Sequence, residues 1–240
     1  MWPKRGRYNH PQVKMLNVIF TVLFIALWTL LSGVFAQCPE TAGYLGAFDS
    51  FSGAFIGAVS RNFPVPATIP GAFTLDRTGN PANYLAVIAY TNSTSEGDAA
   101  LLQILNPGDP SAPFVSLVVG VLDCNTAAFP NFVNPSAILA PSDGFPHGAL
   151  PIPGLGRTTY MGGYGNLLSW CGEPMGFLVR NAFGRNVLAP VWTDPNGSQH
   201  SLFMVQDLTH NYLAATPDPD IYASSNGGVV VEEVNLAVFL

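Results

Sequence analysis

Lysine is missing from almost the whole chain, because none follows Lys14. Charged residues of all kinds make up only 10% of the 240 residues. After residue 36, five arginines stand against fifteen acidic residues, which gives that part of the chain a net charge of −10. A surface of this sign repels polyanions. Nucleic acid and anionic lipid are therefore excluded as expected partners.

Long helices and metal motifs are missing as well. The chain contains 24 glycines and 21 prolines, which interrupt it every few residues and exclude long helices from the body of the protein. Its three cysteines form no CxxC pair, and its histidines do not stand at the usual spacing of metal ligands. We therefore expect no metal ion and no other cofactor.

The amino terminus has the layout of an export signal. Four basic residues come first: Lys4, Arg5, Arg7 and Lys14. The uncharged run 15–36 follows, and Val34-Phe35-Ala36 puts small or modest side chains at the two positions that a signal peptidase pocket must accommodate. We predict that 1–36 is a signal peptide. The alternative is an uncleaved signal anchor, since a helix of this length covers about 30 Å and could span a bilayer. In that case the membrane is contacted only through residues 15–36. Both alternatives leave 37–240 as a single β-rich domain outside the cytoplasm, secreted or displayed at the surface.

An oxidising compartment favours a disulfide, and export from a eukaryotic cell would allow N-glycosylation. We predict a Cys124–Cys171 pair, because both cysteines follow apolar stretches inside the domain, whereas Cys38 lies next to the new terminus. The spacing alone leaves the two other pairings open. Asn92 and Asn196 begin Asn-x-Ser/Thr triplets and are the predicted N-glycosylation sites.

The body of the chain predicts an all-β fold, an antiparallel β-sandwich or barrel. Nine short apolar or alternating stretches are bounded by turn residues: 54–60, 73–75, 84–91, 100–105, 114–122, 175–180, 187–193, 202–207 and 229–240. Phe114–Leu122 is apolar on both faces, so we expect it to be a central strand of a meander formed with 84–91 and 100–105. A hairpin is expected at Asn196-Gly197. It joins Val187–Thr193 to Ser201–Asp207.

The region 125–158 is rich in proline and has little periodicity. We predict one long loop there, which lies over the sheet. Loops of such length are uncommon unless they form a binding surface or a lid.

Catalytic motifs are weak. There is no Gly-x-Ser-x-Gly elbow, and no glycine-rich loop is followed by lysine. Acidic residues that could serve a glycosidase are Asp143, Glu173, Asp207, Asp218 and Asp220, but their separation in space decides that chemistry. His147, with Asp207 or with His200 and His210, is the best remaining acid–base or metal candidate. Solvent-exposed loop histidines are the simpler interpretation.

The most suggestive recognition segment follows the long loop. Tyr160, Tyr164 and Trp170 stand in an uncharged, glycine-rich setting with Asn166 nearby. Aromatic faces stack on sugar rings or peptides, and amides bind hydroxyl groups. The alternative interpretation is a set of ordinary core aromatics beside the disulfide.

Together these patterns predict a secreted or surface-exposed binding protein rather than an enzyme. It would recognise a glycan or an extracellular protein through the 125–170 region. Two alternatives stay open. One is an extracellular hydrolase that uses Asp or Glu residues with His147, and the other is a structural coat or wall component that is cross-linked through Cys38.

Overall fold

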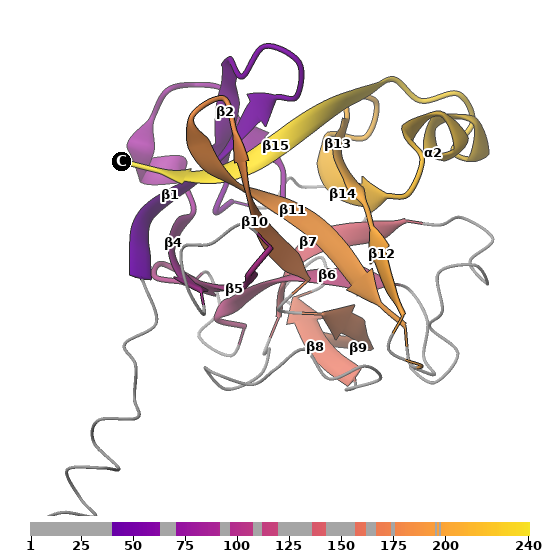
Figure 1. The fold of residues 1–240 in the computed structure, drawn as a ribbon, viewed down its shortest axis with the longest axis horizontal. Coiled ribbons are helices and arrows are strands. Elements are labelled where there is room, and N and C mark those ends of the chain that lie inside the picture. The colour runs from indigo at the N-terminus through magenta and orange to yellow at the C-terminus, as the bar shows by residue number, and fades with distance from the viewer. Residues whose placement is uncertain are drawn as a thin grey trace, which may run out of the picture. The chain divides into compact units, whose positions relative to one another are not determined.

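The structure is a computed structural model of the chain (Figure 1). It describes residues 40–62, 71–91, 97–107, 112–119, 136–142, 157–161, 167–173, 176–194, 196 and 198–240. These residues belong to one compact unit, Pro39–Leu240. The predicted signal or anchor segment lies outside the described residues. Within the described ranges, no helix has the length and apolar character that crossing a bilayer requires.

The described residues are mostly in strands. Those of the first half are β1 (Glu40–Asp49), β2 (Phe55–Val59), β3 (Leu75–Asp76), β4 (Ala86–Thr91), β5 (Ala99–Ile104), β6 (Phe114–Val119) and β7 (Ala137–Ser142). Those of the second half are β8 (Arg157–Met161), β9 (Leu167–Glu173), β10 (Phe177–Ala182), β11 (Arg185–Thr193), β12 (Gln199–Ser201), β13 (Phe203–Asp207), β14 (Tyr212–Thr216) and β15 (Val231–Phe239). Two short helices accompany them: the 3-10 helix η1 (Pro81–Asn83) and α2 (Pro219–Ser225).

Eight of the strands close an antiparallel barrel. Around the ring their order is β1, β4, β5, β6, β7, β14, β13 and β15, and β15 pairs with β1 again. The closed ring satisfies the backbone groups of these strands without exposing an edge. The all-β antiparallel prediction is confirmed, and of the two predicted architectures the molecule adopts the barrel.

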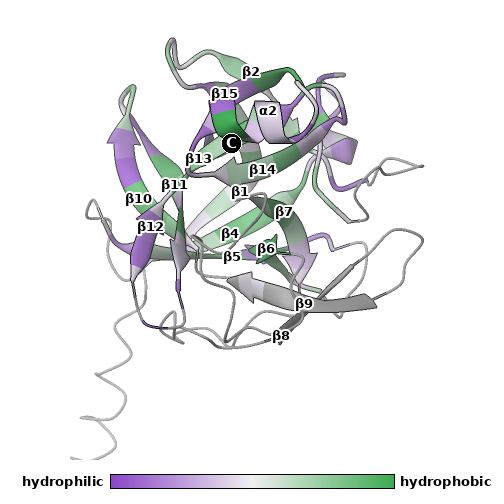
Figure 2. Ribbon diagram, turned by 90° about the vertical axis from the view of Figure 1, so that its right-hand side faces the viewer, coloured by the Kyte–Doolittle hydropathy of each residue, from purple (hydrophilic) through white to green (hydrophobic). Residues whose placement is uncertain are grey.

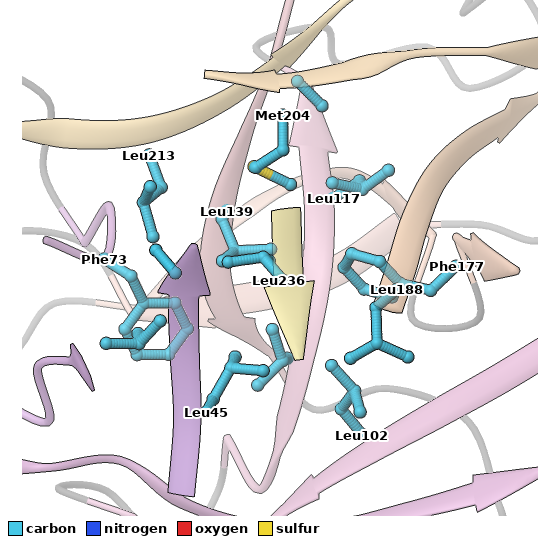
Figure 3. Close-up of a cluster of buried hydrophobic side chains, with 14 of the residues drawn as sticks. Leu45, Phe73, Leu102, Leu117, Leu139, Phe177, Leu188, Met204, Leu213 and Leu236 are labelled. Carbon is cyan, nitrogen blue, oxygen red and sulfur yellow. The ribbon is translucent and has the colours of Figure 1, made fainter. Parts of the chain in front are cut away.

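The barrel interior is filled by alternate residues of its strands. Side chains from separate strands point into one common space in Figure 3, among them Leu45 of β1, Leu117 of β6, Leu139 of β7 and Leu236 of β15. All four are fully buried. Because successive residues of a strand point to opposite faces, the neighbours of these residues lie on the outer side of the barrel.

The sheet forks at two strands of the ring. Strand β5 pairs with β10 at Ala99 and Ala100, but with β6 at Leu102 and Gln103. Strand β15 changes its partner in the same way, from β13 along Val231–Val234 to β11 at Leu236. The β10–β11 hairpin is therefore a second arch that joins β5 to β15. It adds Phe177 and Leu188 to the same core.

The predicted meander is confirmed, and the Asn196 hairpin is confirmed in its first strand and its turn. Strands β4, β5 and β6 are consecutive neighbours, and β6 is buried along almost its whole length. Strand β11 pairs with β12, with Trp192 opposite His200, and Asp194 donates its backbone N–H to the carbonyl oxygen of Ser198. The second strand of this hairpin is β12 (Gln199–Ser201) and not the predicted 201–207. It ends at Ser201, and β13 then pairs with β14 and β15 instead.

The prediction of one long proline-rich loop is wrong for residues 137–142. They form β7, a buried strand that pairs with β6 and β14. Pro141 is tolerated because β14 pairs only with Ala137 and Ile138, so at Pro141 no hydrogen bond to that neighbour is needed. Arg157 and Thr158, at the end of the predicted loop, begin β8. The rest of the predicted loop lies outside the described residues.

Candidate functional site

The outer side of the barrel is hollowed where β15 changes partner. A cleft of about 410 Å³ lies there, between the β10–β11 arch on one side and β13 with β15 on the other. A cavity of this size is in the range of small-ligand sites. Its origin is the fork itself, because two neighbouring strands that diverge leave a space that no main-chain pairing fills. We call this space the fork cleft.

The walls of the fork cleft include outward-facing residues of these strands as well as parts of the core residues Met204 and Val234. On the arch they include Arg180 and Val187, which stand opposite each other in the β10–β11 pairing. On the other side they are Phe203 of β13 and Glu233 and Asn235 of β15, which alternate with the inward-facing Met204, Val234 and Leu236. Figure 2 shows that β10 becomes hydrophilic toward its turn, which is where Arg180 and Asn181 lie.

Two aromatic rings stand at the rim. Phe51 is 82% exposed and Phe203 is 48% exposed, and both line the cleft. The turn that carries Phe51 is built by Asp49, whose carboxylate accepts hydrogen bonds from the Ser52 hydroxyl at 2.5 Å and from the Ser52 backbone N–H at 2.6 Å. The hydrogen bond from the Ser52 hydroxyl is the main reason why the pKa of Asp49 lies below its ordinary value. The local sequence thus fixes a turn that presents an apolar ring to solvent.

Polar residues line the cleft as well. Ser50, Asn181 and Asn235 line the cleft together with Arg180 and Glu233. The Ser50 hydroxyl oxygen is buried and has no hydrogen-bond partner among the described residues. Hydroxyl, amide, carboxylate and guanidinium groups offer both hydrogen-bond donors and acceptors to a ligand.

A second group of residues worth testing as a site surrounds Asp207. Its carboxylate is fully buried and accepts hydrogen bonds from His210 Nδ1 at 2.9 Å, from the Tyr222 hydroxyl at 3.1 Å and from the backbone N–H groups of Thr209 and His210. The Tyr222 hydroxyl also forms a hydrogen bond with the hydroxyl of Tyr212.

This arrangement explains the ionisation of the Asp207 carboxyl. Burial by itself raises the pKa of Asp207, but the hydrogen bonds from the side chain and backbone of His210 and from Tyr222 outweigh it and lower the pKa. Burial also raises the pKa of Tyr222, which therefore stays a neutral donor. Every contact of the carboxylate described here closes the β13–β14 turn or ties α2 to the barrel. These contacts therefore stabilise the fold at this point.

A second histidine–carboxylate pair lies in the β11–β12 hairpin. His200 Nε2 is 2.6 Å from the carboxylate of the buried Asp194. This pair joins the two ends of the hairpin and stands apart in sequence from the Asp207 pair. Among the described residues, no three His, Cys, Asp or Glu side chains gather in a way that could hold a metal ion.

The predicted aromatic segment is described only in its backbone. Tyr160 lies in β8 opposite Leu168, and Trp170 lies in β9 opposite Thr158, so the segment forms an antiparallel hairpin. Tyr164 and Asn166 lie outside the described residues, as does His147. The carboxylates of Asp207, Asp218 and Asp220 do not line the fork cleft. The predicted binding residues and the alternative hydrolase therefore remain predictions.

The predicted covalent features are described in part. Cys171 is paired with Val119 in the sheet. Cys124 comes five residues after Val119 in the sequence and lies outside the described residues. Asn196 is exposed, and its side chain accepts a hydrogen bond from the backbone N–H of Ser198. Asn92 and Cys38 lie outside the described residues.

Sequence reasoning missed the fork cleft. Glu233 and Asn235 were included in a predicted strand, and their alternation with Val234 and Leu236 indicates that they face outward. No local sequence pattern shows which strands pair with β15, because these strands come from distant parts of the chain. Phe51 stands in a turn-like sequence. An aromatic residue in an exposed turn indicates a candidate ligand contact, and this signal could have located one wall of the cleft.

The fold and the fork cleft define the class: a closed antiparallel β-barrel with an open, mixed polar and aromatic cleft on its outer side. Comparison with known proteins adds no closer assignment, since no family model, curated protein or solved structure matches the chain.

Proposed function

We propose that the chain is an exported, non-enzymatic protein that binds a glycan, free or on a glycoprotein partner, in the fork cleft. The observation that carries this proposal is the composition of the cleft, whose lining combines two exposed aromatic rings with amide, carboxylate and guanidinium groups. The export part of the proposal rests on the amino-terminal sequence pattern. That pattern predicts that the domain lies outside the cytoplasm, either secreted or anchored at the surface.

The chemistry of a sugar ring fits this composition. A sugar has an apolar face of C–H groups and an edge of hydroxyl groups. Phe51 and Phe203 can stack on the face, since aromatic rings bind apolar surfaces. Asn181, Asn235 and Glu233 can bind the hydroxyl groups, because they combine donors with acceptors.

The test is a glycan array probed with the protein isolated from cells that express the full chain. We expect binding to at least one class of oligosaccharide. The double variant Phe51→Ala/Phe203→Ala should weaken that binding at least tenfold, because removing two stacked rings costs about 1–3 kcal/mol. The matched control is Leu105→Ala/Leu208→Ala, which truncates two side chains that are 50% and 43% exposed outside the cleft.

Two results would contradict the proposal. One is an array on which the protein binds nothing, and the other is an equal loss of binding in the cleft and control variants. A third result would move the site: if binding survives the cleft variant and is lost in Tyr164→Ala, the sugar occupies the predicted aromatic segment instead of the fork cleft.

A further inference from the structure

Residues of opposite charge line the two walls of the fork cleft. Arg180 lies on the β10 wall and Glu233 on the β15 wall, and among the residues that the structure describes neither takes part in a salt bridge. The neighbouring charges have other partners. The guanidinium of Arg77 is 3.2 Å from Glu232, and that of Arg185 lies 4.0 Å above the ring of Phe48. Glu233 is therefore a carboxylate available to a ligand.

We propose that the sugar bound in the fork cleft carries a protonated amino group, which pairs with Glu233. This inference rests on the proposed function and narrows it to amino sugars. An ammonium group offers three donors, and a charge-assisted bond to a carboxylate is about twice as strong as a bond between neutral groups. Asn235 lies two residues away on the same strand face and can accept a further hydrogen bond from the sugar.

The surrounding charges favour a cation over an anion. Asp49 begins the turn at one end of the cleft, and its pKa is lowered, so it is ionised at neutral pH. The part of the chain after residue 36 has a net charge of −10. Such a field attracts cationic ligands and repels carboxylated or sulfated sugars. Arg180 is the opposing charge, but it is exposed and lies on the far wall, where it can donate to the ring hydroxyls.

The experiment compares two ligands that differ only at the nitrogen. The protein is titrated calorimetrically at about pH 6, where an aliphatic amine is protonated, with the tetramer of glucosamine and with the tetramer of N-acetylglucosamine. We expect the glucosamine tetramer to bind about tenfold more tightly, because only its nitrogen carries a charge. Higher salt should reduce this preference, since part of it comes from the field of the protein.

Two variants show which carboxylate causes the preference for the glucosamine tetramer. Glu233→Gln should abolish the preference for the glucosamine tetramer, because both tetramers then meet a neutral amide at this position. Asp220→Asn changes the net charge by the same amount at an exposed position on α2, outside the cleft, and should keep the preference. Circular dichroism of both variants checks that the fold is retained.

The outcomes separate this inference from the proposed function. Equal affinity for the two tetramers, tighter binding of the N-acetylated one, or loss of the preference in Asp220→Asn would overturn the amino-group inference and leave sugar binding intact. Binding of other sugars on the array but of neither tetramer would do the same. A protein that binds no sugar at all would overturn the proposed function as well.

Discussion

Asp207 joins three parts of the fold through one carboxylate. Its partners come from the β13–β14 turn and from α2, and the Tyr222 hydroxyl among them also contacts Tyr212 of β14. A buried charge that is held by several donors is stable only while all of them are in place. The first prediction at this scale follows from that dependence.

Asp207→Asn should lower the free energy of unfolding by about 3 kcal/mol at pH 7, because it removes a buried charge and leaves its donors poorly paired. The folded-state pKa of Asp207 lies below the ordinary value of 3.8. The unfolded state therefore binds more protons at acidic pH. The contribution of Asp207 is complete above that ordinary pKa and is lost as the pH falls through the folded-state value.

Urea unfolding at a series of pH values measures both effects. The wild-type protein should lose stability below about pH 4, and Asp207→Asn should show a shallower loss. Asp220→Asn is the control, since its carboxylate is exposed on the first turn of α2. An Asp207→Asn variant as stable as the control at pH 7 would contradict the account of this network.

At the scale of elements, two turns support one end of the fork cleft. The β1–β2 turn carries Phe51, and the β10–β11 turn carries Phe183. Gly53 has a φ of +71°, and a methyl group there would come within 2.6 Å of the Phe183 ring. The close approach of the two turns thus depends on a glycine for space as well as for backbone conformation.

Gly184 provides a matched control for this contact. It also has a φ of +71°, but a methyl group there would meet nothing within 4 Å. Gly184→Ala should therefore cost about 1 kcal/mol of unfolding free energy, which is the cost of the left-handed backbone alone. Gly53→Ala should cost about 3 kcal/mol, because overpacking is added to that cost. Equal losses in thermal or urea unfolding would show that the two turns are not packed together.

Elements with a strong local pattern could be predicted from the sequence. The run 114–122 is apolar on both faces and gave β6, and Asn196-Gly197 gave the β11–β12 turn. Strand β7 could not be predicted, because prolines surround its short apolar run and its burial comes from β6 and β14. Strand β1 was missed for a different reason. Its glycines weaken the strand pattern, although Gly43 and Gly46 allow close contact with Phe239.

At the scale of the whole molecule, the sequence predicted the antiparallel all-β class but not the fork. Closing a barrel depends on which distant strands pair, and the partner change of β15 from β13 to β11 has no local signal. The candidate site was missed for the same reason. Its walls combine residues near 50, 180, 203 and 233, which only the folded barrel brings together.

The predicted export of the protein has a consequence that can be measured on the whole molecule. In the secreted protein we expect Cys124 and Cys171 to form a disulfide. In the sheet Cys171 lies opposite Val119, which precedes Cys124 by five residues in the sequence. Mass spectrometry of non-reduced peptides from the isolated protein checks the pairing. Free thiols at both positions, or a bond from Cys38 to either cysteine, would contradict the prediction.

The central claim, that the fork cleft binds sugar, is tested most directly by nuclear magnetic resonance. The isotope-labelled protein is titrated with the oligosaccharide that binds most strongly on the array. The account predicts that the largest shifts of backbone amide signals occur at Arg180–Ala182, Phe203–Met204 and Glu233–Asn235. Shifts concentrated at Arg157–Glu173, or spread evenly over the barrel, would contradict it.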